Sequence, residues 1–260
     1  PLDDDVITRV VIDEAGQCAP VYAAPALRRA TRAMLTGDTA QLPPVYALDD
    51  RLDARLARDL DAKAVAPFRM GNSAMTSAQA VAELRVEPVA LVEHFRSQPE
   101  IVSLASSWSG YALEVRTPAR SLAHLAPWLR APALLLVVEG RGERGGDGVV
   151  NEAEARRAVA AVERLLRDGV EARDIAVLSP FVGQSARIER ALRASGAAGE
   201  HGVLVRTVHR LQGGERRVVV LSVTATAPRH LRWLEEHPHL LHVATSRAQD
   251  HLVVLASPLA

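Results

Sequence analysis

Two adjacent carboxylates follow a short apolar run near the start of the chain. The run covers residues 6–12, and Asp13 and Glu14 come directly after it. Two acids at the carboxyl end of a strand can bind a hydrated Mg²⁺ through one carboxylate and take a proton from an attacking water with the other. The same acids could instead cap a following helix, because carboxylates favour helix starts. The pair alone leaves both interpretations open.

A second polar turn, LTGDTAQLPPV at residues 35–45, also follows an apolar run. Asp38 and Gln41 are expected to project from the end of this turn. In parallel sheets, ligands lie beyond the carboxyl ends of the strands. If the two runs form neighbouring strands, we therefore expect these two side chains to converge with the acid pair Asp13 and Glu14.

Short apolar runs alternate with helical stretches along the chain, which is typical of parallel α/β proteins. Strands are predicted over residues 6–12, 32–36, 89–92, 133–138, 175–179, 203–208, 218–223 and 252–256. Helices are predicted over residues 20–30, 152–168, 184–194 and 239–248, while 43–86 is predicted to be helical or irregular. The five glycines of residues 140–148 predict a loop, and a division into two parts is expected near residue 90.

The helix after Asn151 has the clearest start signal. Asn151 is expected to cap it, with Glu154 reaching back in a capping-box arrangement. Val159, Val162 and Leu166 then fall on one face, which predicts a helix packed on the core.

The composition is that of an ordinary globular protein. The 260 residues are 48% hydrophobic, and their formal net charge is 0. The net charge therefore does not indicate a polyanionic partner, although a local basic groove could still bind one. The single cysteine, Cys18, excludes an internal disulfide and fits a reducing cytoplasm. Apolar runs fall well short of the ~20 residues of a membrane span, so no membrane partner is expected. The opening residues predict the interior of a longer polypeptide.

Six segments, in order, resemble the motifs of superfamily 1 helicases of the 5′-to-3′ type, in the branch of the nonsense-mediated-decay and Okazaki-maturation helicases. VVIDEAGQ and LTGDTAQLPPV resemble the Walker B and sensor motifs. VEHFRSQPEI, IAVLSPFVGQ, VRTVHRLQGGERRVVVLSV and HVATSRAQDHLVVLA follow in the family's order. The resemblance implies a RecA-like fold of the P-loop NTPase type, with parallel sheets flanked by helices. It also implies ATP and Mg²⁺ as cofactors and single-stranded DNA or RNA as a partner.

The resemblance assigns residues 1–90 to the C-terminal part of a first RecA-like domain and residues 91–260 to a second. In the first part, Asp13 would organise Mg²⁺ and Glu14 would activate the hydrolytic water. Gln41 would sense the γ-phosphate, and Asp38 would link the nucleotide to the nucleic-acid path.

In the second part, Arg96 and Arg247 would act as arginine fingers, whose planar guanidinium groups offset charge on the transferred phosphoryl group. The other implied roles are nucleotide contact by Gly213 and Glu215, and nucleic-acid contact by Pro180, Gln184, Thr207 and His209. Simpler alternatives exist. The two arginines could be ordinary surface residues, the Gly213 segment could be a plain turn, and Glu215 could pair only with the arginines that follow it.

The sequence departs from the family pattern at several positions. His209 replaces an acid, His242 replaces an asparagine, and Gln98 replaces a histidine. These changes spare the predicted catalytic residues, so ATP hydrolysis is better supported than unwinding. His237, His239 and His242 also suggest a zinc site, but apart from Glu235 and Glu236 no cysteine pair or acid cluster would complete its ligands, so a helix-lining or capping role is favoured.

The phosphate-loop pattern G-x-x-x-x-G-K-[ST] does not occur in the sequence. In the family this loop precedes Walker B, so we expect a missing N-terminal half of the same polypeptide to supply it. The predicted function is the C-terminal portion of an ATP-dependent superfamily 1 helicase or translocase, inactive as this chain alone. The alternative is a degenerate RecA-like nucleotide switch or scaffold within a larger regulatory or defence protein.

Overall fold

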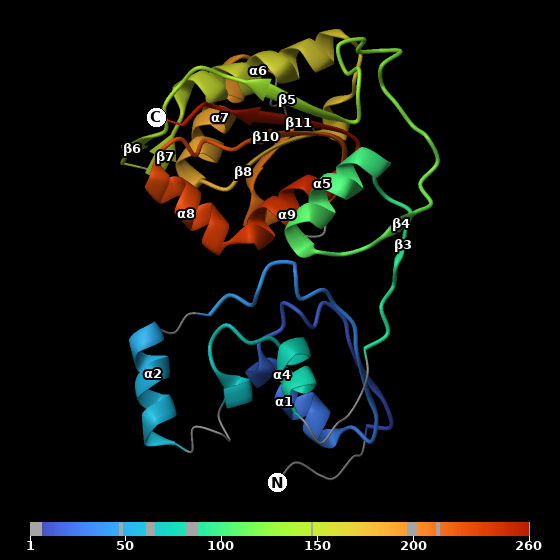
Figure 1. Cartoon of the computed structure of the whole chain (residues 1–260), viewed down its shortest axis with the longest axis vertical. Coiled ribbons are helices and arrows are strands. Elements are labelled where there is room, and N and C mark those ends of the chain that lie inside the picture. The colour runs from blue at the N-terminus through green and yellow to red at the C-terminus, as the bar shows by residue number, and fades with distance from the viewer. Residues whose placement is uncertain are drawn as a thin grey trace. The chain divides into compact units, whose positions relative to one another are not determined.

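The computed structural model describes residues 7–46, 49–60, 66–81, 88–146, 148–196, 202–211 and 214–259. The chain forms two compact units, Pro1–Ala90 and Leu91–Ala260 (Figure 1). Among the described residues, no helix has the length and apolar character needed to span a membrane.

The first unit is built on two short parallel strands, β1 (Val10–Ile12) and β2 (Ala33–Leu35), in which Ile12 pairs with Leu35. Helix α1 (Pro20–Arg29) connects them, so the two predicted strands are indeed neighbours. The remaining elements of this unit are α2 (Asp50–Asp59), the 3₁₀ turn η1 (Ala66–Phe68) and α4 (Ala74–Ala80). Both strands are shorter than predicted, although a bridge between Ile7 and Ala30 extends their pairing.

One face of the β1–β2 pair is apolar and exposed. Val11 and Met34 are register partners, and 65% and 60% of their surfaces are exposed. Val21 and Tyr22 of α1 are exposed as well. Strands of this composition are normally covered in parallel α/β proteins.

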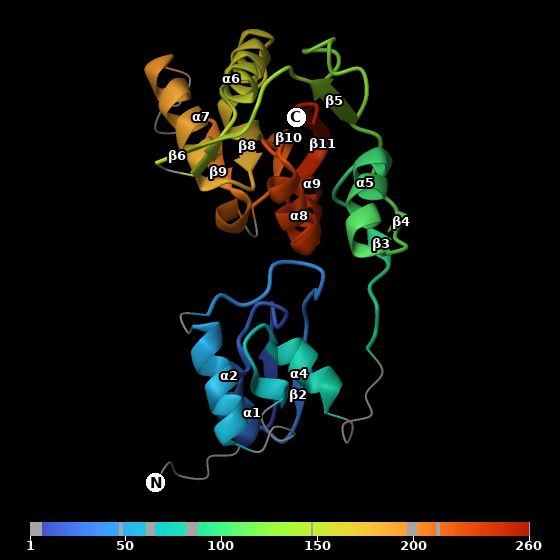
Figure 2. The same ribbon diagram turned by 60° about the vertical axis from the view of Figure 1, so that its left-hand side comes forward.

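The second unit contains a five-stranded parallel sheet in the order β5-β11-β10-β8-β9. Its strands are β5 (Ala133–Val137), β8 (Ile175–Ser179), β9 (Leu204–Thr207), β10 (Arg216–Ser222) and β11 (Ala248–Ala256). Helices α6 (Glu152–Arg167) and α7 (Val182–Ala194) cover one face, and α5 (Pro99–Ser109), α8 (Pro228–Glu236) and α9 (Pro238–Ser246) lie on the other (Figure 2). The predicted α/β class with a parallel sheet flanked by helices is confirmed.

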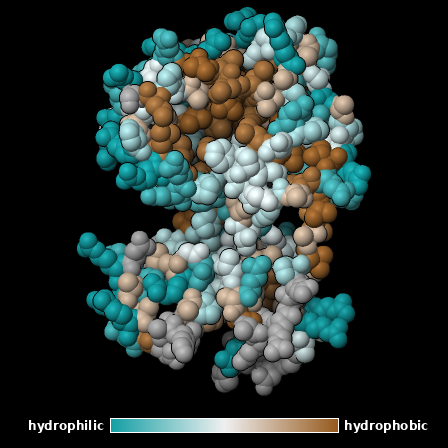
Figure 3. All heavy atoms as spheres, in the orientation of Figure 1, coloured by the Kyte–Doolittle hydropathy of each residue, from teal (hydrophilic) through white to brown (hydrophobic). Residues whose placement is uncertain are grey.

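The core of the second unit lies between the sheet and α6 and α7. All five residues of β8 are buried, as are Val162 and Leu165 of α6. The edge strand β5 is less well covered: Leu135 and Val137 are exposed, and apolar side chains gather over this part of the unit (Figure 3).

Several predicted elements were wrong. Residues 89–92 form no strand. The strand pairing begins at β3 (Glu93–His94) with β4 (Glu114–Val115), and the preceding apolar run contributes the Val92 carbonyl, which accepts from the Glu114 amide at 2.8 Å. Residues 140–148 contain most of a hairpin, β6 (Glu143–Gly145) and β7 (Gly148–Val150), in which Gly148 adopts a left-handed φ of 115°.

Helix α8 was not predicted, and β11 begins four residues before the predicted strand. Its first residues include Gln249, Asp250 and His251, whose polarity concealed the strand in the sequence. The second unit also contains two short 3₁₀ turns, η2 (Ala172–Asp174) and η3 (Val208–Leu211).

The Asn151 cap is confirmed, but the capping box is wrong. Asn151 Oδ1 accepts hydrogen bonds from the amides of Ala153 and Glu154. Glu154 is fully buried, and its carboxylate accepts from Ser222 Oγ at 2.7 Å and from the Thr224 amide at 2.8 Å. Burial raises the pKa of Glu154, while these hydrogen bonds oppose the rise. The carboxylate therefore bonds the loop after β10 and, at 3.1 Å, the Asn151 side-chain amide, while the Asn151 backbone amide that a capping box needs donates to Gln184.

Candidate functional site

The two polar turns of the first unit lie at one edge of the β1–β2 pair, because the strands are parallel and end together. Asp13 Oδ1 accepts hydrogen bonds from Thr36 Oγ1 at 2.5 Å and from the Glu14 amide at 2.9 Å. The Thr36 hydroxyl first, and the Glu14 amide second, lower the pKa of Asp13 below its ordinary value. Asp13 is thus an exposed carboxylate held in its ionised form.

Glu14 has a left-handed backbone, with φ of 52°, which costs a non-glycine residue about 1–2 kcal/mol. Its side chain is exposed, and its Oε2 accepts a hydrogen bond from Gln17 Nε2 at 2.7 Å. The helix-cap alternative for these acids is wrong, because α1 starts at Pro20 and Ala19 is its N-cap residue. Backbone strain of this kind clusters at functional sites.

Two glycines bring the polar turns together. A Cβ at Gly16 would lie 2.5 Å from the Asp38 carbonyl oxygen, and one at Gly37 would lie 2.7 Å from the Gly16 nitrogen. The two turns therefore pack backbone against backbone. Asp38 Oδ2 accepts from Gln41 Nε2 at 3.0 Å, so Gln41 is held at the same edge as the acid pair.

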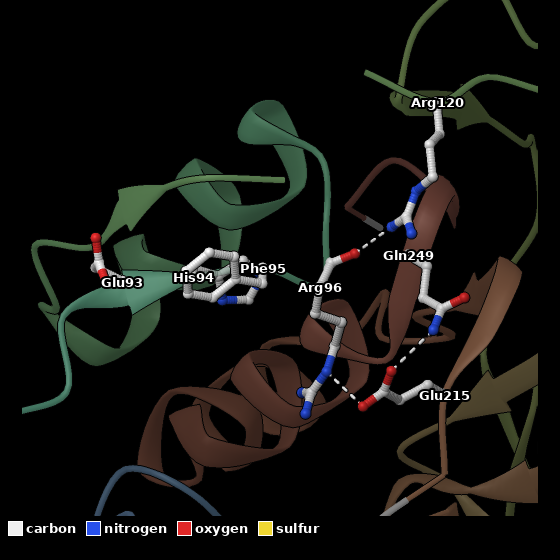
Figure 4. Close-up of a pocket in the computed structure, with 7 residues that line it drawn as sticks. All are labelled: Glu93, His94, Phe95, Arg96, Arg120, Glu215 and Gln249. Atoms are coloured by element: carbon white, nitrogen blue, oxygen red, sulfur yellow. Dashed lines mark hydrogen bonds and ion pairs between the residues drawn. The ribbon is translucent and has the colours of Figure 1, made fainter. Parts of the chain in front are cut away.

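The second unit has a pocket of about 480 Å³ that contains two of the predicted residues (Figure 4). Arg96 Nε lies 2.5 Å from Glu215 Oε1, and Gln249 Nε2 donates to Glu215 Oε2 at 2.9 Å. The alternative that Glu215 pairs only with the arginines after it is therefore wrong. The full lining consists of Glu93, His94, Phe95, Arg96, Arg120, Glu215 and Gln249.

Five of the lining residues were missed by sequence reasoning, and two of them, His94 and Phe95, flank Arg96 directly. His94 Nε2 accepts a hydrogen bond from the Ser97 amide at 2.8 Å, which closes the turn around Arg96. Burial first, and the charge of Arg96 second, lower the pKa of His94, so its ring is neutral at neutral pH. Phe95 is 63% exposed in the pocket. Phe95 could have been identified from the sequence, because it lies between His94 and Arg96 in a segment that resembles a helicase motif.

Arg247, the other predicted finger, has a different environment. It is the C-cap residue of α9 and is only 3% exposed. Its Nε donates to the Val243 carbonyl at 3.3 Å, and its own carbonyl accepts from the Arg216 amide at 3.1 Å. The structure thus presents Arg96 in the pocket and keeps Arg247 inside the unit. Gly213 lies outside the described residues.

The predicted nucleic-acid residues divide into buried and accessible ones. Gln184 is fully buried: its Oε1 accepts from the Asn151 amide at 2.8 Å, and its Nε2 donates to Ser222 Oγ at 2.9 Å. An amide committed in this way is not available to nucleic acid, so the structure does not support that contact. Pro180 is also buried, whereas Thr207 is partly exposed and His209 is exposed.

The histidines near the start of α9 form ring contacts. The ring centroid of His237 lies 5.0 Å from that of Trp233 and 5.6 Å from that of His239. His237 Nδ1 bonds the Trp233 carbonyl, and His242 Nδ1 bonds the Ala105 carbonyl. In the part of the chain that the structure describes, no group of three or more His, Cys, Asp or Glu residues is arranged to hold a metal ion, so the zinc alternative gains no support.

This histidine group predicts a loss of stability in acid. Burial first, and the charges of His237 and His209 next, lower the pKa of His239 from 6.5 to about 4. Between these values the unfolded chain binds a proton that the folded chain does not, so the free energy of unfolding should fall as the pH drops from 6.5 towards 4. Above pH 6.5 the His239 contribution is complete.

Urea unfolding at several pH values tests this expectation. His239→Gln should make the dependence on pH shallower, whereas His124→Gln, at an exposed histidine, should leave it unchanged. Equal slopes for wild type and His239→Gln would show that His239 does not titrate as proposed.

Comparison with known proteins is consistent with these features. Residues 4–49 and residues 70–258 each match the AAA-domain family. The chain is 28% identical over 271 aligned residues to the ATP-dependent helicase NAM7 of Saccharomyces cerevisiae, covering 98% of this chain and 26% of the relative. It is 24% identical to the Drosophila melanogaster regulator of nonsense transcripts 1 homolog, covering 96% of this chain and 21% of the relative.

The chain therefore spans about a quarter of the length of these curated relatives. Among solved structures, the arterivirus nonstructural protein 10 helicase is similar with a TM-score of 0.47 at 16% identity, over 97% of this chain and 41% of that one.

Proposed function

This chain belongs to the AAA-domain family, and from that premise we propose that it is the C-terminal portion of the motor of an ATP-dependent superfamily 1 helicase. Residues 1–90 would complete a first RecA-like domain, and residues 91–260 would form the second. The observation that carries the proposal is the edge of the first unit, where the ionised Asp13, the strained Glu14 and the Asp38–Gln41 pair stand at the ends of two neighbouring parallel strands.

The residues at this edge fit Mg-ATP. Asp13 is exposed and ionised, so it would hold Mg²⁺ or a water of its shell. Glu14 is exposed beside it and would accept a proton from the attacking water. Gln41, oriented by Asp38, would bond the γ-phosphate. Bound Mg²⁺ would supply positive charge that offsets the charge of the phosphates.

The pocket of the second unit contains further residues that we propose to contact the nucleotide. Arg96 would donate to the transferred phosphoryl group, and Glu215 would contact the nucleotide while holding Arg96 between turnovers. The exposed ring of Phe95 is suited to stack on a nucleobase, because aromatic faces pair readily with flat π-systems. Arg247 is proposed as a second finger, which requires its guanidinium to be uncovered when nucleotide binds. Gly213 is also proposed to contact the nucleotide.

Single-stranded DNA or RNA is the proposed partner, contacted through the segment of Thr207 and His209 at the end of β9. Gln184 would act indirectly, by holding Asn151 and Ser222 in place. A 5′-to-3′ direction is proposed from the resemblance to that branch of the family. A cytoplasmic location is proposed from the single cysteine.

The phosphate loop is proposed to lie in a preceding part of the same polypeptide. Two observations support this: the loop's pattern is not in the sequence, and the apolar face of β1 and β2 is exposed. Further strands and helices of the first domain would cover that face and place the loop beside Asp13.

The purified 260-residue chain should therefore release phosphate from ATP at the background rate, even with single-stranded nucleic acid. The amides and lysine of a phosphate loop form the main cradle for the nucleotide, and the chain has none of them. A version extended upstream through the phosphate loop is the positive control, in which nucleic acid should stimulate phosphate release. Stimulated turnover by the short chain would contradict the proposed division and require a phosphate site within it.

A further inference from the structure

Arg96 is held by its backbone as well as by its side chain. Arg120 Nη2 donates to the Arg96 carbonyl, and the Arg96 side chain pairs with Glu215 (Figure 4). Arg120 belongs to the segment between β4 and β5, where no helix or strand was predicted before residue 133. The predicted finger is thus fixed at two points, and one of them is a residue with no assigned role.

The segment that contains Arg120 also forms hydrogen bonds with the residues after Arg96. Gln98, which is buried, donates from Nε2 to the Pro118 carbonyl at 3.1 Å and accepts at Oε1 from the Arg120 amide at 3.4 Å. The Gln98 amide donates to the Gln249 carbonyl at 3.0 Å, which ties the same turn to the start of β11. Residues 96–98 are therefore held between the Arg120 segment and the central sheet.

A buried acid anchors Arg120 to the sheet. Asp250 is 1% exposed, and its Oδ1 lies 2.9 Å from Arg120 Nε. Its Oδ2 lies 2.7 Å from Arg217 Nε on β10. Among the described residues Oδ1 has no hydrogen-bond partner, so Asp250 holds Arg120 through an ion pair, whereas Arg217 Nε donates a hydrogen bond to Oδ2. Leaving one charge of a buried pair without its partner is costly. The two arginines differ in their other partners: Arg120 donates to the Arg96 carbonyl, whereas among the described residues Arg217 makes no hydrogen bond or ion pair with residues 96–98.

We propose that Arg120, anchored by Asp250, is a positioning residue that sets where Arg96 stands in the nucleotide pocket. The inference rests on the proposed role of Arg96 and adds the residue, Arg120, that would keep Arg96 in position. A long arginine side chain has many rotamers, and a displacement of about 1 Å at a catalytic group can cost up to ~100-fold in rate. Fixing the backbone at Arg96 while Glu215 restrains the guanidinium reduces that freedom before nucleotide binds.

The first test needs no catalysis. In the ¹⁵N-labelled 260-residue chain, the Nε–Hε signal of Arg96 reports its pairing with Glu215, and Arg96→Lys identifies it by its loss. Arg120→Ala should shift or broaden this signal. Arg217→Ala and Arg173→Ala should leave it in place, since Arg173 is an exposed residue that pairs with exposed Glu171, and neither lines the pocket. An unchanged Arg96 signal in Arg120→Ala would overturn the proposal, as would an equal change in Arg217→Ala.

The second test is a double-mutant cycle in the full-length, ATP-hydrolysing protein. Arg120→Ala should lower kcat about 10- to 100-fold with little change in KM, and the melting temperature should stay close to that of Arg217→Ala. Because Arg120 acts through Arg96, adding Arg120→Ala to Arg96→Ala should lower kcat no further. Arg120→Lys, which keeps the charge near Asp250, should recover part of the loss.

The outcomes distinguish the proposed catalytic role of Arg96 from the proposed positioning role of Arg120. Normal kcat in Arg96→Ala would mean that the proposed function of Arg96 fails. A low kcat in Arg96→Ala with normal kcat in Arg120→Ala would overturn only the positioning role. Independent losses that multiply in the double mutant would also overturn it, because Arg120 would then act on the substrate itself.

Discussion

Glu14→Gln should leave ATP binding nearly intact and reduce ATP hydrolysis by about 10²–10⁴-fold in the full-length protein. The amide keeps the size and hydrogen-bonding reach of the carboxylate but cannot accept the proton of the attacking water. The left-handed backbone at Glu14 is retained, and the contact with Gln17 survives as an amide–amide hydrogen bond. Equilibrium binding of ATP and single-turnover phosphate release measure the two effects separately.

Asp59→Asn is a suitable control for this change, because Asp59 is an exposed acid at the end of α2 in the same unit. It should change neither binding nor turnover. If Glu14→Gln lost ATP binding together with hydrolysis, Glu14 would be a residue that shapes the turn, and the role of general base would have to be given up.

Arg96→Ala and Arg247→Ala should each lower kcat by about 10³-fold or more, which is the usual contribution of an arginine finger. Lysine should substitute poorly, since it cannot make the planar two-pronged contact with a phosphoryl group. Because both residues would act on one transition state, the double mutant should lose less than the product of the single losses. The measurement is kcat for the two single mutants and the double mutant.

The two arginines need different folding controls. Arg96 lies in an open pocket, so its removal should hardly affect the melting temperature, whereas Arg247 is 3% exposed and its truncation also removes buried contacts. Arg116→Ala, at an exposed arginine of the same unit, serves as the reference for both. Near-normal turnover in either single mutant would identify that arginine as a structural or surface residue.

The sequence predicted the parts of the site that follow strand ends. Asp13 and Gln41 could be placed together because parallel strands with polar turns must end at the same edge, and the register of Ile12 with Leu35 confirms that arrangement. The distances that matter within each turn were not predictable. They depend on backbone contacts such as that of Gly16 with Asp38, which leave no periodic pattern in the sequence.

Other features depend on partners that are distant in the chain. Gln184 occupies a motif position, but its burial follows from hydrogen bonds to Asn151 and Ser222, which lie more than 30 residues away. Likewise, Arg120 meets Asp250 across 130 residues, from a segment with little apolar periodicity. Periodicity predicts which face of an element is buried, but not which polar side chain will find a partner there.

The central claim is that these residues form the hydrolytic part of a nucleic-acid motor, and ATP-dependent translocation tests it most directly. The full-length protein should displace a labelled strand or a bound block from single-stranded nucleic acid only when ATP is present, at a rate that follows ATP turnover. Glu14→Gln should bind the same strand and ATP without moving along it. Strand binding that responds to ATP with no hydrolysis and no movement in the wild-type protein would contradict the account and identify a nucleotide switch instead.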